Sequence, residues 1–115
     1  IFTGIMQDHY CWANGFWYDE KMDLTHDDPF ISHKRLSTFN ADQKTKDLTD
    51  YLLEMHENYR GTHLMIPMGC DFAYANARLG FENVDRIIDY FNAHNDENIE
   101  LIYSTPGAYL DGMYS

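Results

Sequence analysis

Asp71 is the residue of this chain that is best placed for acid–base chemistry. It follows the apolar run 63–68 closely, and Phe72 and Tyr74 stand beside it. Apolar neighbours at the end of a strand disfavour the charged form of a carboxyl group and raise its pKa, as a general acid requires. Position alone favours the alternative, in which Asp71 caps a turn or the following helix.

A second group of polar residues has the types that bind metal ions. His26 is followed by Asp27 and Asp28. Two or three ligands in a loop make a weak metal site, so we interpret this group as a solvated acidic loop. Cys11 and Cys70 are too few for a disulfide scaffold, and they have no metal-binding spacing.

The segment 7–39 is rich in aromatic residues and has neither a helical nor a strand period. A stretch of this length is either a functional loop or a segment whose packing partners are missing, and we favour the functional loop. Its aromatic side chains would suit stacking on sugar faces or packing of the loop on the rest of the domain, and we favour packing. These residues are Trp12, Phe16, Trp17 and Tyr18.

Three helices are expected after residue 40. Asn40 with Gln43 predicts an N-cap and capping box, and Arg60-Gly61 predicts the end of that helix. The spacing of Phe81, Val84, Ile87, Ile88 and Phe91 predicts a second helix, with Glu82 and Asp85 near its N-terminus. Thr105-Pro106 predicts the start of a third, which continues to Ser115. The first helix has an apolar stripe at Ala41, Thr45, Leu48, Leu52, Met55 and Tyr59.

Three strands are expected between these helices, at 1–6, 63–68 and 99–105. The order is strand, long loop, helix, strand, helix, strand, helix, which is typical of a parallel sheet or barrel. Three strands cannot close a barrel, so we expect a slice of a larger α/β domain. In such folds reactive groups gather after the strands, here at 69–74 and 104–106.

Charge and composition exclude several classes of function. The chain has 115 residues, with 8 Lys and Arg against 19 Asp and Glu and a formal charge of −11. So acidic a chain repels phosphate backbones, and we expect no nucleic-acid partner. No apolar run approaches the roughly 20 residues that span a bilayer, and the first residues do not form a signal peptide, so we expect no membrane partner.

The segment His63–Ala77 resembles the acid/base segment of glycoside hydrolase family 38, the retaining α-mannosidases, in which an apolar strand leads to Gly-x-Asp-Phe-x-Tyr. Residues 1–10 resemble the strand and Tyr-bearing loop that precede that segment. The resemblance is to the lysosomal type above all, and it extends over 11–62 in layout only. Downstream it continues through 81–85, 91–93, 103–106, Tyr109 and Leu110.

The resemblance implies roles for four residues. Asp71 matches the general acid/base of the family, and Tyr10 matches a tyrosine near the bound sugar. Phe72 and Tyr74 are expected to contact the substrate as well. The nucleophilic Asp and the zinc-binding His-x-Asp pair would lie upstream of residue 1, and the last zinc-ligand His downstream of residue 115, so we expect no metal ligand within this chain.

The resemblance also implies the architecture and the function. We expect a partial parallel β/α barrel, a slice of a larger seven-stranded-type barrel catalytic domain, with residues 1–115 as one fragment that is incomplete at both ends. The full-length protein would use zinc and cleave terminal α-mannose from N-linked glycans or oligomannose, with retention of configuration, in the lysosome or vacuole. The fragment, whose partner is the rest of the polypeptide, is expected to be inactive alone. The alternative is a non-catalytic acidic α/β module that binds carbohydrate or a protein partner through its aromatic loop.

Overall fold

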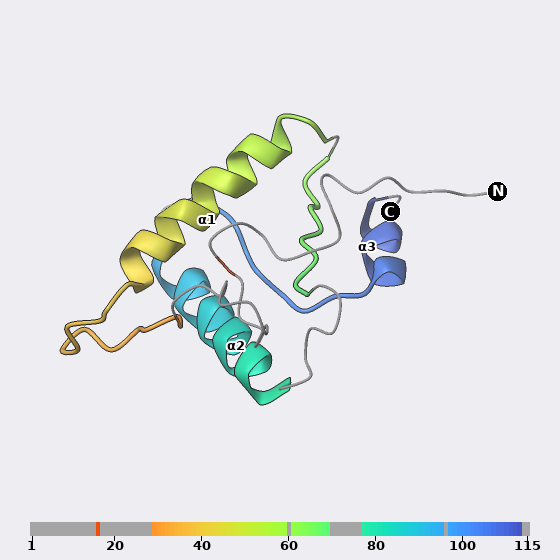
Figure 1. Ribbon diagram of the computed structural model, residues 1–115. Helices are drawn as coiled ribbons and strands as arrows, with labels where there is room; N and C mark the ends of the chain where they lie inside the picture. The colour runs from red at the N-terminus through yellow and green to blue at the C-terminus, as the bar shows by residue number, and fades with distance from the viewer. Residues whose placement is uncertain (1–15, 17–28, 60, 70–76, 96, 114–115) are drawn as a thin grey trace.

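A computed structural model describes residues 16, 29–59, 61–69, 77–95 and 97–113 of the chain (Figure 1). These residues contain three α-helices, which are α1 (Ala41–His56), α2 (Ala77–His94) and α3 (Pro106–Met113). Helices α1 and α2 pack against each other, the extended segment 61–69 follows α1 in the chain, and the extended segment 97–105 leads into α3 (Figure 1). None of the helices in the described part of the chain is both long and apolar enough to cross a membrane.

The predicted partial parallel β/α barrel is wrong for the part of the chain that the structure describes, which contains helices and no strand. The segments 63–68 and 99–105 are present but form no ladder, and the expected strand at 1–6 lies outside the described residues. A strand is defined by hydrogen bonds to a neighbouring strand. The backbone of Leu101 instead bonds to a side chain, since its N–H donates to Asn92 Oδ1 (2.8 Å) and its C=O accepts from Asn92 Nδ2 (2.9 Å).

The two extended segments nevertheless place apolar side chains against the core. In each segment the partly buried apolar side chains that pack against the core cluster are two residues apart. The strands were predicted from a nearly continuous apolar run at 63–68 and from alternation at 99–105, and neither pattern could show whether another strand would lie beside the segment. The packed side chains are Leu64, Ile66 and Met68 in the first segment, and Ile99 and Leu101 in the second.

Helix α1 forms where its apolar stripe predicted it. The stripe residues from Ala41 to Met55 are buried. The helix ends at His56, earlier than predicted, because the N–H groups of Asn58 and Tyr59 bond to carbonyls three residues back rather than four. Gly61 follows with a φ of 78°, a conformation that glycine adopts without strain.

Helix α2 begins at Ala77, four residues before the predicted Phe81. Its first turn therefore contains no acidic residue, and Glu82 and Asp85 lie further along the helix than expected. Phe81 is 49% exposed, since it lies one position off the stripe that the neighbouring helix covers. The buried face consists of Gly80, Asn83, Val84, Ile87, Tyr90 and Phe91.

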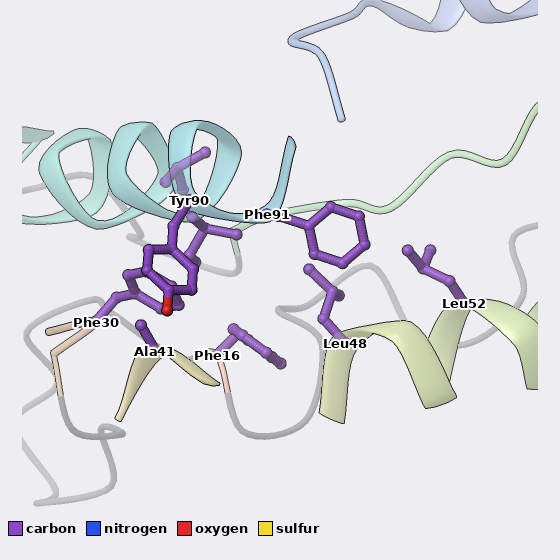
Figure 2. Packing of buried hydrophobic residues seen from close by; sticks show 9 residues of the cluster. Phe16, Phe30, Ala41, Leu48, Leu52, Tyr90 and Phe91 are labelled. Carbon is purple, nitrogen blue, oxygen red and sulfur yellow. The ribbon is translucent and has the colours of Figure 1, made fainter. Parts of the chain in front are cut away.

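The core lies between α1 and α2. The ring of Phe91 on α2 points toward Leu48 and Leu52 of α1, and it is fully buried (Figure 2). Phe16 and Phe30, which precede both helices in the sequence, fill the same cluster (Figure 2). The aromatic segment thus contributes at least two side chains to packing, in agreement with the interpretation of Phe16 as a packing residue.

Candidate functional site

The residues predicted to act on a substrate lie outside the described part of the chain. These are Asp71, Tyr10, Phe72 and Tyr74. Their assignments stay predictions, as does the interpretation of His26 and its acidic neighbours. The described residues on either side of 70–76 are the extended segment that ends at Gly69 and helix α2, which begins at Ala77.

The extended segment before Asp71 is held against the core at one end and by α3 at the other. Ile66 and Met68 pack against the core cluster. A Cβ atom on Gly112 of α3 would lie only 3.3 Å from Cε1 of His63, so the helix backbone lies close to that imidazole. Helix α3 therefore returns to the start of the segment that leads to the predicted acid.

The N-terminal half of α2, directly after the predicted acid segment, carries a row of exposed charged side chains. Arg78 Nε donates to Glu82 Oε1 at 2.7 Å, and Arg86 Nη2 lies 3.9 Å from Glu82 Oε2. The hydrogen bond and charge of Arg78 lower the pKa of the Glu82 carboxyl group. Exposed ion pairs of this kind contribute little to stability.

The second predicted reactive point, 104–106, has a structural role in the described residues. Thr105 Oγ1 accepts a hydrogen bond from the N–H of Ala108 at 3.1 Å, which confirms Thr105 as the cap of α3. Next to it, the Tyr103 hydroxyl donates to Asp85 Oδ1 at 2.5 Å, and its ring lies 6.3 Å from that of Phe81. These contacts join the extended segment 97–105 to α2.

Two polar residues on the packed face of α2 were missed by sequence reasoning. Asn83 is only 1% exposed, and its Oδ1 accepts a hydrogen bond from the N–H of Phe30 at 2.8 Å. Tyr90 is also buried, and its hydroxyl donates to the Asp42 carboxylate of α1. A signal for Asn83 was present, because an amide within an apolar helical stripe needs a buried partner.

The environment of Tyr90 is set by both helices. The hydrogen bond to Asp42, together with burial and the charge of that carboxylate, raises the pKa of Tyr90 to about 12. Its ring also stacks on the His94 imidazole, with the two centroids 4.0 Å apart. Tyr90 is thus a neutral hydrogen-bond donor that joins α1 to α2.

Metal-binding residues do not gather in the described ranges. No group of three or more His, Cys, Asp or Glu side chains there could hold a metal ion.

Comparison with known proteins decides the family. The N-terminal domain model of glycosyl hydrolases family 38 matches residues 1–115. The chain belongs to glycosyl hydrolase family 38. Within the family it is similar to proteins named as alpha-mannosidases, several of them lysosomal.

Three of these family 38 relatives come from distant organisms. The lysosomal alpha-mannosidase of Dictyostelium discoideum is 35% identical over 114 residues, which are 98% of this chain and 11% of the relative. The human lysosomal alpha-mannosidase is 33% identical over 116 residues, 96% of this chain and 11% of the relative. An alpha-mannosidase of Arabidopsis thaliana is 33% identical over 118 residues, 100% of this chain and 11% of the relative.

The family 38 match confirms the resemblance inferred from the residues around Asp71, and it extends that resemblance over the aromatic segment. The chain spans about a tenth of the length of the curated relatives it matches.

Proposed function

We propose that the full-length protein is a retaining α-mannosidase that removes terminal α-mannose from N-linked glycans or oligomannose. The observation that carries this proposal is the family 38 match over the whole chain, together with the names of its relatives. A location in the lysosome or vacuole is part of the proposal, and it is supported by the lysosomal relatives.

Asp71 is the general acid/base in this proposal. In the first step a carboxylate from elsewhere in the polypeptide attacks the anomeric carbon, while Asp71 gives its proton to the departing glycosidic oxygen. In the second step Asp71 removes a proton from water, which attacks the same carbon and releases mannose. The two carboxyl groups of a retaining enzyme must lie about 5–5.5 Å apart, so this chain supplies one half of the pair.

Three aromatic residues complete the proposed sugar site. Tyr10, Phe72 and Tyr74 offer flat apolar faces and hydroxyl groups, which suit a sugar with one apolar face and many hydroxyls. Zinc is also proposed for the full-length protein, where it would hold sugar hydroxyl groups. The described residues do not supply a ligand set for it, so no step of the reaction is assigned to the ion.

The acid/base assignment is tested with Asp71→Asn in the full-length protein. An amide keeps the shape of the side chain but cannot deliver a proton. General acid/base catalysis is worth about 10²–10⁴-fold, so cleavage of natural glycans should fall by about that factor. Formation of the glycosyl-enzyme from substrates whose leaving group is a stabilised phenolate should slow far less. Azide should partly restore the turnover of these substrates, because an anion attacks without having to lose a proton.

A matched control is Asp89→Asn, which removes an exposed carboxylate from α2 and should leave both substrate classes unchanged. If Asp71 is only a turn or cap residue, Asp71→Asn should be tolerated, because asparagine caps about as well as aspartate, and both substrate classes should be affected equally. An equal effect on both substrate classes would therefore refute the acid/base assignment.

A further inference from the structure

The segment 32–38, between the core residue Phe30 and helix α1, is a loop in which every residue is exposed. It projects from the start of α1 on the side away from α3 (Figure 1). It contains the basic pair Lys34-Arg35, and the next residue, Leu36, is 51% exposed. Exposed loops with small and polar residues are preferred sites of proteolytic cleavage, and many endoproteases cut after a pair of basic residues.

Secondary structure separates this pair from the other cations. Within the described ranges every other Lys or Arg belongs to a helix. A protease binds its substrate in an extended conformation, so a helix must first unfold locally before it can be cut. The helical residues are Lys44 and Lys46 on α1 and Arg78 and Arg86 on α2.

The tip of the loop is held by a few local hydrogen bonds. The C=O of His33 accepts from the N–H of Leu36 at 3.1 Å, and Nδ1 of the His33 ring accepts from the N–H of Arg35 at 3.3 Å. The C=O of Leu36 accepts from the N–H of Phe39 at 3.1 Å. None of these bonds reaches α1 or α2, so extending the tip into a protease costs little.

The base of the loop, in contrast, is fixed across the basic pair. The side chain of Asn40 accepts from the N–H of Ile31 at 2.8 Å and donates to the C=O of Pro29 at 2.9 Å. The N–H of Asn40 also donates to the C=O of Ile31 at 3.2 Å. A cut between residues 31 and 40 would leave all three bonds in place, and they would join the two products.

The core joins the same two parts of the chain. The ring of Phe30 is 1% exposed and lies in the cluster that α1 and α2 form (Figure 2). The N–H of Phe30 donates to Oδ1 of the buried Asn83 on α2 at 2.8 Å. The residues before the loop are therefore packed and hydrogen-bonded to residues after it, independently of the peptide bonds at the tip.

The charges of the pair keep the loop in water in the full-length protein as well. Neither Lys34 nor Arg35 makes an ion pair within the described part of the chain. Covering the loop with an apolar surface would bury two unpaired charges, which is costly. The apolar surface that another part of the protein would cover lies elsewhere, at Phe81, Ile102 and Tyr103.

We propose that the pair Lys34-Arg35 is a processing site for an endoprotease that cuts after paired basic residues. Water is added across the peptide bond between Arg35 and Leu36, so Arg35 gains a terminal carboxylate and Leu36 a terminal amino group. The two chains stay assembled through Asn40, Phe30 and the core.

Limited digestion of the folded full-length protein with trypsin tests access to the site. Mass spectrometry should find the first new N-terminus at Leu36. The double variant Lys34→Gln/Arg35→Gln should slow cleavage at this position by about tenfold or more, because trypsin needs a basic side chain before the cut. Lys46→Gln, which removes an exposed cation from α1, is the matched control and should leave the first cut unchanged.

Gel filtration of the cut protein tests the assembly of the two chains. The chains should elute together without denaturant and separate only in denaturant. A reductant is present throughout, so that a disulfide cannot hold them together. Separation of the chains without denaturant would overturn the second half of the proposal.

The deciding measurement is mass spectrometry of the protein isolated, with protease inhibitors, from the cells that make it. A break within 34–36 supports the proposal. A chain that is intact across 32–38 overturns it even where trypsin cuts the loop, and so does a first tryptic cut at any other position. None of these readouts depends on α-mannosidase activity, so the site is tested even if the proposed function fails.

Discussion

At the scale of single residues, Tyr90 shows how one side chain joins the two packed helices. Its ring belongs to the core on α2, and its hydroxyl reaches the Asp42 carboxylate in the first turn of α1. The hydroxyl group can donate this hydrogen bond only while it is protonated. Because the pKa of Tyr90 is raised, the hydroxyl stays protonated to a pH well above neutral. The contact should therefore stabilise the packing of α1 on α2 in a pH-dependent way.

Tyr90→Phe removes this hydrogen bond and keeps the ring. At about pH 8 it should lower the free energy of unfolding by about 1 kcal/mol, because a hydrogen bond to a partly exposed carboxylate is lost. The folded chain holds the Tyr90 proton up to about pH 12, whereas the unfolded chain releases it near pH 10. The stabilisation is thus fully present below about pH 10 and is lost as the pH rises through 12.

The measurement is urea unfolding of the full-length wild type and the full-length variant, followed by circular dichroism at about pH 8 and about pH 11. Since other high-pH effects act on both proteins, only the difference between them reports on Tyr90. A difference that stays constant over this pH range would contradict the assignment.

At the scale of elements, the start of α1 separates what local sequence predicts from what it cannot. The stripe from Ala41 to Met55 gave the helix and its buried face, since helical periodicity is a local property. The prediction of a capping box at Asn40 and Gln43 was wrong, because the Asn40 side chain makes no cap hydrogen bond and the Gln43 side chain donates to Asp47 instead. The Asn40 side chain instead forms hydrogen bonds with the backbone of Pro29 and Ile31. The residue types that predict the start of a helix carry no information about such tertiary hydrogen bonds.

Asn40→Ser distinguishes a role of Asn40 as helix cap from its role in holding Pro29 and Ile31. Serine is as good an N-cap as asparagine, so a capping residue would tolerate the change. Its hydroxyl is too short to bond to both Pro29 and Ile31, and we expect a loss of about 1 kcal/mol, close to that of Asn40→Ala. The same unfolding measurement checks this, and a fully stable Asn40→Ser beside a destabilised Asn40→Ala would restore the cap interpretation.

The extended segments mark a second limit of sequence reasoning. The nearly continuous apolar run 63–68 predicted a short strand; its side chains Leu64, Ile66 and Met68 do pack against the core, but the described residues form no strand. Pairing depends on a neighbour that is distant in sequence, and here Asn92 and Asn95 bond to the backbone of 99–101 from the end of α2. For the candidate site the motif around Asp71 was enough to predict the family, whereas the geometry of Asp71 stays untested.

At the scale of the whole molecule, large apolar side chains remain on the surface of the described ranges. Ile102 is 71% exposed and Tyr103 is 54% exposed, and both lie in the segment that connects α2 to α3. Phe81 on α2 stands beside Tyr103 and is also half-exposed. Contiguous exposed apolar groups usually mark a surface that another part of a protein covers.

The 115-residue chain alone should therefore be poorly stable. We expect a broad thermal transition and binding of a dye that fluoresces on apolar surface, because too little of the apolar surface is covered. Differential scanning calorimetry and dye fluorescence check this directly. A sharp two-state melt of a monomer that binds no dye would favour the alternative of a non-catalytic module that folds on its own.

The central claim is that this chain is part of a retaining α-mannosidase, and the stereochemistry of the first product tests it most directly. The full-length protein is incubated with an aryl α-mannoside, and proton NMR follows the anomer that appears before mutarotation. The 115-residue chain alone, with and without added zinc, serves as the comparison. We predict that the full-length protein releases α-mannose first and that the chain alone releases none, since Asp71 is proposed as only one of the two carboxylates that the reaction needs. First release of β-mannose, no cleavage by the full-length protein, or turnover by the chain alone would contradict the account.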